Sequence, residues 1–469
     1  MEIRTRMAPS PTGKLHLGTA YAALWPYLFA KKNQGTFILR IEDTDTERST
    51  KEFAENIIDG LVWLGLKWDG GPFYQMERLS LYKEKAEELI KENKAYYCFC
   101  SMRELEEERK KQAAADQSQI YSGKCRNLPK EEIEQKLSSG VDFVIRFKLP
   151  VERGKVKFSD LIHGEIEFDS QLLGDMVIMR KNGIPLYNFV VVVDDLDMKI
   201  THVLRGDDHI SNTPRQILLF EAFNTPPPQY GHYPMILNQD RSGKLSKRTG
   251  STALSDYRAD GFLPEAIINY LALLGWTPPG DREILSKEEL IQLFEIKNMN
   301  VGAAAWNQQK LDWINGQYIR SMSDEELTQR LQEFLPDHPI REKIAEVVPL
   351  IKDRIKKLSD FVPLTNFLFT EPEYEKSVFQ GIYKKENLRQ IMEKIVEVME
   401  KLPRPWQKEV FEEAFRKFAE EEGLSVTETF QLLRVGISGQ TVSPPLFESM
   451  QILGDQESVA RLQKALSIL

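Results

Sequence analysis

Short apolar runs alternate with segments of helical periodicity in the first hundred residues. Apolar positions within residues 3–7 and 36–41 predict two strands. Residues 19–32, 50–66 and 78–93 repeat apolar side chains at helical spacing and predict helices. Strands that alternate with helices are typical of a parallel sheet whose faces are covered by helices. The N-terminal part of the chain is therefore expected to hold an α/β domain.

The pattern changes between residues 98 and 175. A charged helix is predicted at 102–114, followed by short β runs at 143–149 and 165–168. Because this segment interrupts the alternation, we interpret it as an insertion into the first domain. The α/β pattern then resumes, with predicted strands at 189–193, 202–204 and 230–237 and predicted helices at 213–223 and 263–274.

Helical periodicity dominates after residue 321. Further helices are predicted at 324–334, 341–357, 385–401 and 406–422. A chain of 469 residues is too long for one ordinary core. The expected fold class is multidomain α/β plus all-α, with a Rossmann-like parallel sheet, an inserted α+β subdomain, a connecting region and a helical C-terminal half. The expected boundaries are 1–99 and 190–250 for the sheet domain, 100–189 for the insertion, 251–321 for the connecting region and 322–469 for the helical half.

The charge balance excludes only indiscriminate binding to nucleic acid. Lys and Arg number 62 against 71 Asp and Glu, a net charge of −9, so any RNA contact must be local. The N-terminus lacks the apolar core of a signal peptide, and no apolar stretch is long enough to span a bilayer, so we expect a cytoplasmic protein without membrane contact. Three cysteines in so long a chain exclude a disulfide framework.

The first candidate motif lies where a predicted strand leads into a helix. His16, Gly18 and Thr19 follow the turn-rich segment 9–13. A helix N-terminus presents free N–H groups to phosphate, Gly18 allows a close approach to the backbone, and His16 can donate to a phosphoryl oxygen. The alternative is a structural histidine, which is the commoner role of an isolated one.

The second candidate motif is a basic loop that contains Lys244, Lys247 and Arg248. Glycine and serine residues around it favour mobility, and its cations can stabilise the charge that develops on departing pyrophosphate. The alternative is a solvated basic loop. Its pairing with the His16 motif in one α/β domain favours the catalytic interpretation.

These two loops resemble the HIGH and KMSKS signatures of class I aminoacyl-tRNA synthetases. Four segments are similar to the bacterial type of the glutamyl branch: RMAPSPTGKLHLGT, FILRIEDTD, LYNFVVVVDD and HVLRGDDHISNTPRQ. The resemblance implies that glutamate is joined to the 3′ end of tRNA(Glu) through a glutamyl-adenylate, with release of pyrophosphate and AMP. It also implies that the insertion binds the acceptor end, that the connecting region contacts the tRNA stem and that the helical half binds the anticodon. We expect a monomer.

The resemblance implies a pocket for the amino acid. Arg6 and Arg205 can hold carboxylates, and Glu42 can hold the ammonium group. Ser10 and Tyr187 add hydroxyl groups, with Asn188 nearby. Some family members have a polar residue where this chain has Val191, a contact that Asn188 is expected to replace. The alternative for Arg6 and Glu42 is a structural salt bridge.

The resemblance also implies a site for ATP. The expected residues are Ala8, His16, Gly18, Asp208, Ile236 and Lys247. His16, Lys244 and Lys247 are the expected catalytic residues. Mg²⁺ is expected to accompany the triphosphate, and we assign it no protein ligand.

The three cysteines lie close together in the sequence, at Cys98, Cys100 and Cys125. Thiolates at such spacing are plausible zinc ligands. The resemblance implies a structural zinc in the insertion, with Tyr121 as fourth ligand because Asn127, a poor ligand, stands at the family's usual place. The alternative is three buried cysteines without metal.

The helical half offers a candidate surface for RNA. Lys352, Arg354, Lys356 and Lys357 are expected on one helix, followed by the aromatic residues Phe361, Phe367 and Phe369. Cations with nearby aromatic rings suit single-stranded bases, and a solvated helix face is the alternative.

The sequence also leaves three other functions to consider. An enzyme that glutamylates a modified tRNA base shares the catalytic half but is short, so the helices after Ser321 argue against it. A small-molecule nucleotidyltransferase without an RNA partner would not need those helices or the insertion. An RNA-binding regulator would not need intact His16, Lys244 and Lys247.

Overall fold

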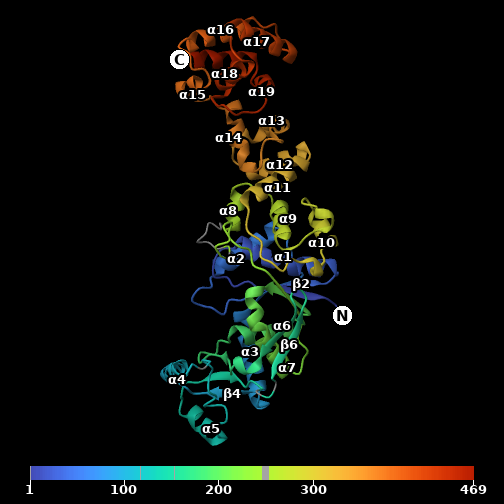
Figure 1. Ribbon diagram of the computed structural model, residues 1–469, viewed down its shortest axis with the longest axis vertical. Coiled ribbons are helices and arrows are strands. Elements are labelled where there is room, and N and C mark those ends of the chain that lie inside the picture. Colours follow the sequence, from blue (N-terminus) through green and yellow to red (C-terminus); the bar gives the residue numbers. More distant parts are fainter. Residues whose placement is uncertain (1, 117, 151, 153, 244, 246–252) are drawn as a thin grey trace. The chain divides into compact units, whose positions relative to one another are not determined.

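The computed structural model describes residues 2–116, 118–150, 152, 154–243, 245 and 253–469. The chain divides into two compact units (Figure 1). Unit 1 comprises residues 1–258 and 264–311, and unit 2 comprises residues 259–263 and 312–469. In the described parts of the chain, no helix combines the length and apolarity needed to cross a bilayer.

Unit 1 begins with a parallel three-stranded sheet, as the alternating pattern predicts. Its strands are β1 (Arg4–Met7), β2 (Thr36–Ile41) and β3 (Gly70–Tyr74). The helices α1 (Leu17–Lys32) and α2 (Lys51–Trp63) connect these strands. The side chains of His16 and Thr50 cap the two helices and fix where each one begins. The predicted strands and helices of this segment are confirmed.

A second sheet has the order β7-β6-β10-β9. The strands β9 (His202–Gly206), β10 (Gln229–Tyr233) and β6 (Lys155–Asp160) run parallel, and β7 (Gly164–Asp169) is antiparallel to β6. The Thr201 N–H donates to the Arg4 carbonyl at 2.9 Å, which places β9 beside β1. The carboxyl ends of parallel strands form the usual ligand-binding edge of such sheets.

The segment predicted as a strand at 189–193 is a helix instead, α6 (Tyr187–Asp197). The strand prediction was wrong because four consecutive valines favour a strand locally. Phe189 through Asp195 are all buried, so α6 needs no polar face and shows no helical alternation in its sequence. Helical spacing makes Val191 an i+4 neighbour of Tyr187 and Asp195 an i+4 neighbour of Val191.

A third sheet is antiparallel and combines two strands of the segment interpreted as an insertion with β4, which lies just before the expected start of that segment at residue 100. Its strands are β4 (Ala95–Cys98), β5 (Val144–Phe147) and β8 (Val177–Met179), with α4 (Met102–Ala114) and α5 (Lys130–Ser138) in the connections. The remaining helices that belong wholly or partly to unit 1 are α3 (Leu79–Lys91), α7 (Thr213–Ala222), α8 (Leu254–Ala259), α9 (Pro264–Gly275), α10 (Lys287–Leu293) and α11 (Gln308–Ser321).

Unit 2 is helical, as the periodicity predicts. Its helices are α12 (Asp324–Phe334), α13 (Ile344–Ile351), α14 (Phe361–Thr365), α15 (Lys376–Ile382), α16 (Leu388–Lys401), α17 (Lys408–Glu422), α18 (Val426–Ser438), α19 (Leu446–Leu453) and α20 (Asp455–Ser467). Leu388, Ile391, Met392 and Ile395 lie at helical spacing on the buried face of α16, which packs against α20.

Two expectations about the RNA-binding surface are wrong in detail. The helix predicted at 341–357 is shorter and spans only Ile344–Ile351. In the segment after it, the Asp360 carboxylate accepts the N–H groups of Lys356 and Lys357, each at 2.9 Å. The basic residues therefore do not share one helix. Phe361 and Phe367 are buried in the core of unit 2 and cannot stack on bases.

Candidate functional site

A cavity of about 680 Å³ lies at the carboxyl ends of β1, β9 and β10, beside the start of α1. Most of the site residues expected from the sequence line it. They are Arg6, Ala8, Ser10, His16, Gly18, Glu42, Tyr187, Arg205, Asp208 and Ile236. Residues from distant parts of the sequence thus meet in one cavity, at the edge where parallel sheets bind ligands.

Three other residues expected at the site are not in this group. Asn188 does not line the cavity, and its Oδ1 accepts from Gln216 Nε2 at 3.1 Å. Lys244 and Lys247 lie outside the described residues. Leu245, between them, does line the cavity.

His16 caps the N-terminus of α1. Its Nδ1 accepts from the Thr19 N–H at 3.3 Å, and its Nε2 lies 3.2 Å from Thr19 Oγ1. A Cβ at residue 18 would lie 3.1 Å from His16 Nδ1, so Gly18 leaves the space that the imidazole occupies. The helix N-terminus and the imidazole both face the cavity, an arrangement suited to phosphate.

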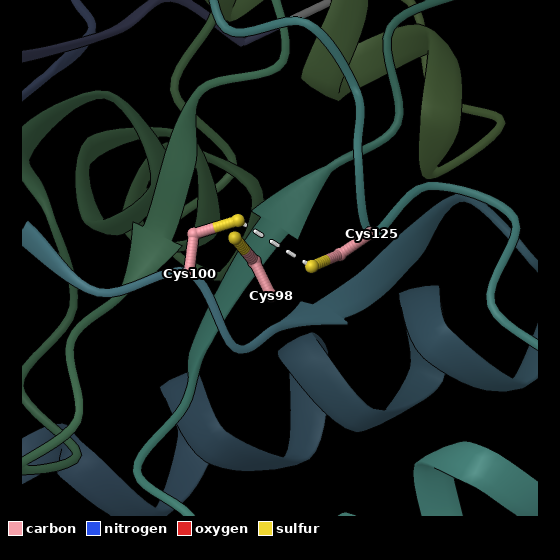
Figure 2. Close-up of side chains that lie close together, drawn as sticks. All are labelled: Cys98, Cys100 and Cys125. Carbon is pink, nitrogen blue, oxygen red and sulfur yellow. Dashed lines mark hydrogen bonds between the residues drawn. The ribbon is translucent and has the colours of Figure 1, made fainter. Parts of the chain in front are cut away.

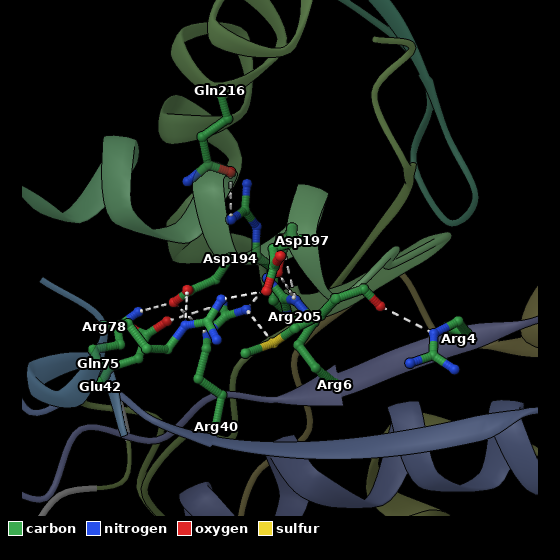
Figure 3. Close-up of polar contacts among 12 residues, drawn as sticks. Arg4, Arg6, Arg40, Glu42, Gln75, Arg78, Asp194, Asp197, Arg205 and Gln216 are labelled. Atoms are coloured by element: carbon green, nitrogen blue, oxygen red, sulfur yellow. Dashed lines mark hydrogen bonds and ion pairs between the residues drawn. The ribbon is translucent and has the colours of Figure 1, made fainter. Parts of the chain in front are cut away.

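A buried network of charges lies next to Arg6 and Glu42 of the cavity (Figure 3). Arg40 donates to Asp195 at 2.7 Å and to Glu42 at 3.2 Å, and it forms a 3.5 Å ion pair with Asp194. Arg6 donates through Nε to Asp195 at 3.2 Å. Arg6 and Glu42 therefore do not pair with each other, because each is held by a different partner.

The network shifts the ionisation of its members. Burial raises the pKa of Glu42 above its ordinary value, although Arg40 and Arg6 act in the opposite direction. Burial also favours protonation of Asp195, but there Arg6 and Arg40 outweigh it and hold the pKa low. Glu42 is thus an anion at the edge of the cavity that protonates more readily than an ordinary carboxylate.

Arg205 is only 6% exposed and has a different kind of environment. Its Nε donates to His232 Nε2 at 3.1 Å, its Nη1 to Gln216 Oε1 at 2.9 Å and its Nη2 to Thr213 Oγ1 at 2.8 Å. Among the residues that the structure describes, no carboxylate forms an ion pair with Arg205. A guanidinium has more N–H groups than these three acceptors use, so Arg205 can still bind an anion.

His209 is a cavity residue that the sequence did not single out. Its Nδ1 lies 3.1 Å from the Tyr187 hydroxyl. Burial and then the charge of Arg205 lower the pKa of His209 to about 4. A neutral imidazole can therefore orient Tyr187. His209 directly follows the expected ribose ligand Asp208, and that position was the available signal.

The three cysteines converge in unit 1, with Tyr121 beside them (Figure 2 shows the cysteines). Cys100 Sγ lies 3.6 Å from Cys125 Sγ, and the Tyr121 hydroxyl lies 3.4 Å from Cys98 Sγ and 3.5 Å from Cys100 Sγ. Tetrahedral zinc with Zn–S bonds of about 2.3 Å requires sulfur atoms about 3.8 Å apart. These four side chains therefore fit a zinc ion.

The matches to known proteins cover both units. Residues 2–313 match the family described as tRNA synthetases class I (E and Q), catalytic domain, and residues 326–466 match a family described as anticodon binding domain. The chain is 45% identical to glutamate–tRNA ligase 1 of Caldanaerobacter subterraneus subsp. tengcongensis, over 100% of this chain and 98% of that protein. It is 43% identical to glutamate–tRNA ligase 2 of Thermoanaerobacter pseudethanolicus, with the same coverage.

A solved structure matches the fold over its full length. It is a glutamate tRNA ligase from Elizabethkingia meningosepticum in complex with its amino acid, with a TM-score of 0.89, 32% identity and 100% coverage of both chains. The cavity at the sheet edge, the helical second unit and these matches agree with one another. The chain belongs to the family of class I tRNA synthetases for glutamate and glutamine.

Proposed function

We propose that this chain ligates L-glutamate to the 3′ end of tRNA(Glu) in an ATP-dependent reaction. A glutamate α-carboxylate oxygen attacks the α-phosphorus of ATP, which forms glutamyl-adenylate and releases pyrophosphate. A hydroxyl of the terminal adenosine then attacks the acyl carbon, which forms glutamyl-tRNA and releases AMP. Positioning and charge stabilisation supply the catalysis, without a covalent intermediate on the enzyme.

The observation that carries this proposal is the setting of Arg205. A buried guanidinium at the cavity, held only by neutral acceptors among the described residues, suits a substrate carboxylate. Glu42 supplies the anion for the substrate ammonium group, and Arg6 supplies a second guanidinium. A dicarboxylic amino acid has the charges that match this set.

The opposite side of the cavity is assigned to ATP. The N-terminus of α1 and His16 face the phosphates, Asp208 lies near the ribose and Ile236 packs against the adenine. We assign Lys244 and Lys247 to the departing pyrophosphate on the basis of their motif. Mg²⁺ arrives with the triphosphate and neutralises part of its charge.

A structural zinc is part of the proposal. Cys98, Cys100, Cys125 and Tyr121 would hold it, and when bound it would cross-link the ends of the segment that carries them. The proposed partners are tRNA(Glu), glutamate and ATP, and the proposed state is a cytoplasmic monomer. The segments 100–189, 251–321 and 322–469 are assigned to the acceptor end, the stem and the anticodon.

Charging assays test the proposed reaction. Purified protein with ATP and labelled glutamate is expected to charge intact tRNA(Glu). It is expected to leave tRNA(Glu) that lacks its 3′-terminal adenosine unlabelled. Labelling of the truncated tRNA would instead indicate glutamylation of a base. A parallel assay with tRNA(Gln) determines whether one or both tRNAs are substrates.

A further inference from the structure

The neutral surroundings of Arg205 contrast with those of the neighbouring guanidiniums. Arg40 contacts three carboxylates, and Asp195 holds Arg6. Arg205 instead donates to an imidazole, a carboxamide and a hydroxyl (Figure 3 shows the contact with Gln216). A carboxylate placed next to a guanidinium in a poorly solvated site would compete directly with a bound anion.

The imidazole of His232 is fixed as an acceptor toward Arg205. Asp160 Oδ2 lies 2.6 Å from His232 Nδ1, which assigns the proton to Nδ1 and leaves Nε2 to accept from Arg205. Burial lowers the pKa of His232, so the ring stays neutral. Asp160 also accepts the N–H groups of Ile162 and His163, each at 2.9 Å, and these bonds fix its carboxylate in place.

The carboxamide of Gln216 is oriented in the same sense. Its Nε2 donates to Asn188 Oδ1 at 3.1 Å, so its Oε1 is directed to Arg205. Gln216 is 1% exposed and Thr213 is fully buried, both on α7. His232 and Gln216 are thus each held by a further partner, and Thr213 Oγ1 lies 3.0 Å from His232 Nε2. Asn188 does not line the cavity and acts through Gln216.

We infer that His232, Gln216 and Thr213 form a charge-free cradle that positions Arg205 and keeps its charge available for a carboxylate of glutamate. The inference rests on the proposed function. It identifies these three as positioning residues, with Asp160 and Asn188 holding two of them. The cradle orients the guanidinium of Arg205 without neutralising it. Each neutral acceptor orients one N–H group and leaves the net charge of the guanidinium intact.

The test is a matched pair of substitutions at Gln216 in the full-length protein. Gln216→Glu has nearly the same shape and places a carboxylate 2.9 Å from Arg205, whereas Gln216→Met removes the acceptor without adding charge. ATP–pyrophosphate exchange with tRNA(Glu) present gives the KM values for glutamate and ATP. We expect both variants to raise the glutamate KM, and Gln216→Glu to raise it at least about tenfold more than Gln216→Met, because only Gln216→Glu adds a charge that competes with the substrate carboxylate. The ATP KM is expected to stay within about twofold of wild type in both variants.

The KM values distinguish failure of this inference from failure of the proposed function. If Gln216→Glu and Gln216→Met change the glutamate KM equally, the acceptors act only by shape and the inference is overturned. If Arg205→Ala also leaves glutamate use intact, the pocket assignment in the proposed function fails as well. Should Gln216→Glu not fold, as judged by its thermal unfolding, Thr213→Asp paired with Thr213→Val applies the same comparison through Nη2.

Discussion

The guanidinium groups that line the cavity and the buried one beside it differ in which groups neutralise their charge. Arg40 is surrounded by carboxylates, and burial opposes its charge while Asp195, Asp194 and Glu42 raise its pKa. It is therefore a permanent cation that orients the other groups. Arg205 has only neutral partners among the described residues, so a ligand carboxylate would complete its electrostatic environment.

Removing the guanidinium of Arg205 is expected to abolish efficient use of glutamate. Arg205→Ala would leave a substrate carboxylate without its partner in a partly desolvated pocket, a loss of about 3 kcal/mol. That loss corresponds to roughly a hundredfold lower kcat/KM for glutamate. Steady-state exchange assays measure this value, and ATP binding, measured separately by calorimetry, is expected to persist. Near-normal glutamate turnover would mean that Arg205 has a structural role.

The raised pKa of Glu42 predicts a pH dependence of glutamate binding. In the proposed site Glu42 must be ionised to hold the ammonium group, and burial raises its pKa above the ordinary 4.5. Protonation therefore begins at a higher pH than for an exposed carboxyl group. The glutamate KM is expected to rise as the pH falls from about 8 to about 5. Glu42→Gln is expected to have a high KM throughout that range. A wild-type KM that stays flat would show that Glu42 does not bind the ammonium.

The sequence predicts which side chains meet in the cavity better than it predicts how they are held. Motifs at strand ends converge at one sheet edge for topological reasons, so the resemblance could indicate Arg6, Glu42 and Arg205. The partners of these residues depend on packing. Asp195 and His232 reach them from α6 and β10, and no local pattern in the sequence indicates those contacts.

At the level of elements, sequence patterns succeed where one face of an element is polar. The helices α12 and α16 have such faces and were predicted closely. The helix α6 is buried on all sides from Phe189 to Asp195, so its valines suggested a strand. The helix α13 ends at Ile351, and in the segment after it the Asp360 carboxylate accepts the backbone N–H groups of Lys356 and Lys357. Such contacts are not visible as periodicity.

The cysteine cluster predicts a metal-dependent element. We expect about one zinc per chain by elemental analysis, bound less tightly than in a site with four thiolates, because Tyr121 must lose its phenolic proton. Cys125→Ser is expected to lose the zinc and to weaken tRNA charging, while ATP binding remains. Metal content and charging are measured on the same preparation. A metal-free wild-type protein with full activity would contradict the prediction.

At the level of the whole molecule, the division into two units separates the cavity from the helical part proposed to read the anticodon. The basic residues of unit 2 are not equivalent. Asp324 holds Lys352 at 3.0 Å, and Asp260 holds Lys357 at 2.7 Å. Arg354 and Lys356 are exposed, and no carboxylate ion pair engages either of them in the part of the chain that the structure describes.

Arg354 is therefore a better candidate for an RNA contact than Lys352 or Lys357. Arg354→Ala is expected to raise the KM for tRNA in charging by about tenfold, because a charge-assisted contact is lost. Lys357→Ala is the matched control and is expected to change that KM by less than about threefold, since its charge is already paired. The KM for ATP should not change in either variant. Equal effects of the two substitutions would exclude a specific role for Arg354.

The pairing of β6 with β10 has a consequence for how this protein can vary. Asp160 ends a strand from the segment assigned to the acceptor end of the tRNA. Through His232 it nevertheless supports Arg205 in the proposed glutamate pocket. That segment therefore cannot be exchanged independently of the amino-acid pocket. A graft of the whole segment from a relative, or its deletion to make a minimal enzyme, would also replace one support of the amino-acid pocket. Recombination between relatives is expected to succeed only with crossover points that keep Asp160 and His232 from the same parent.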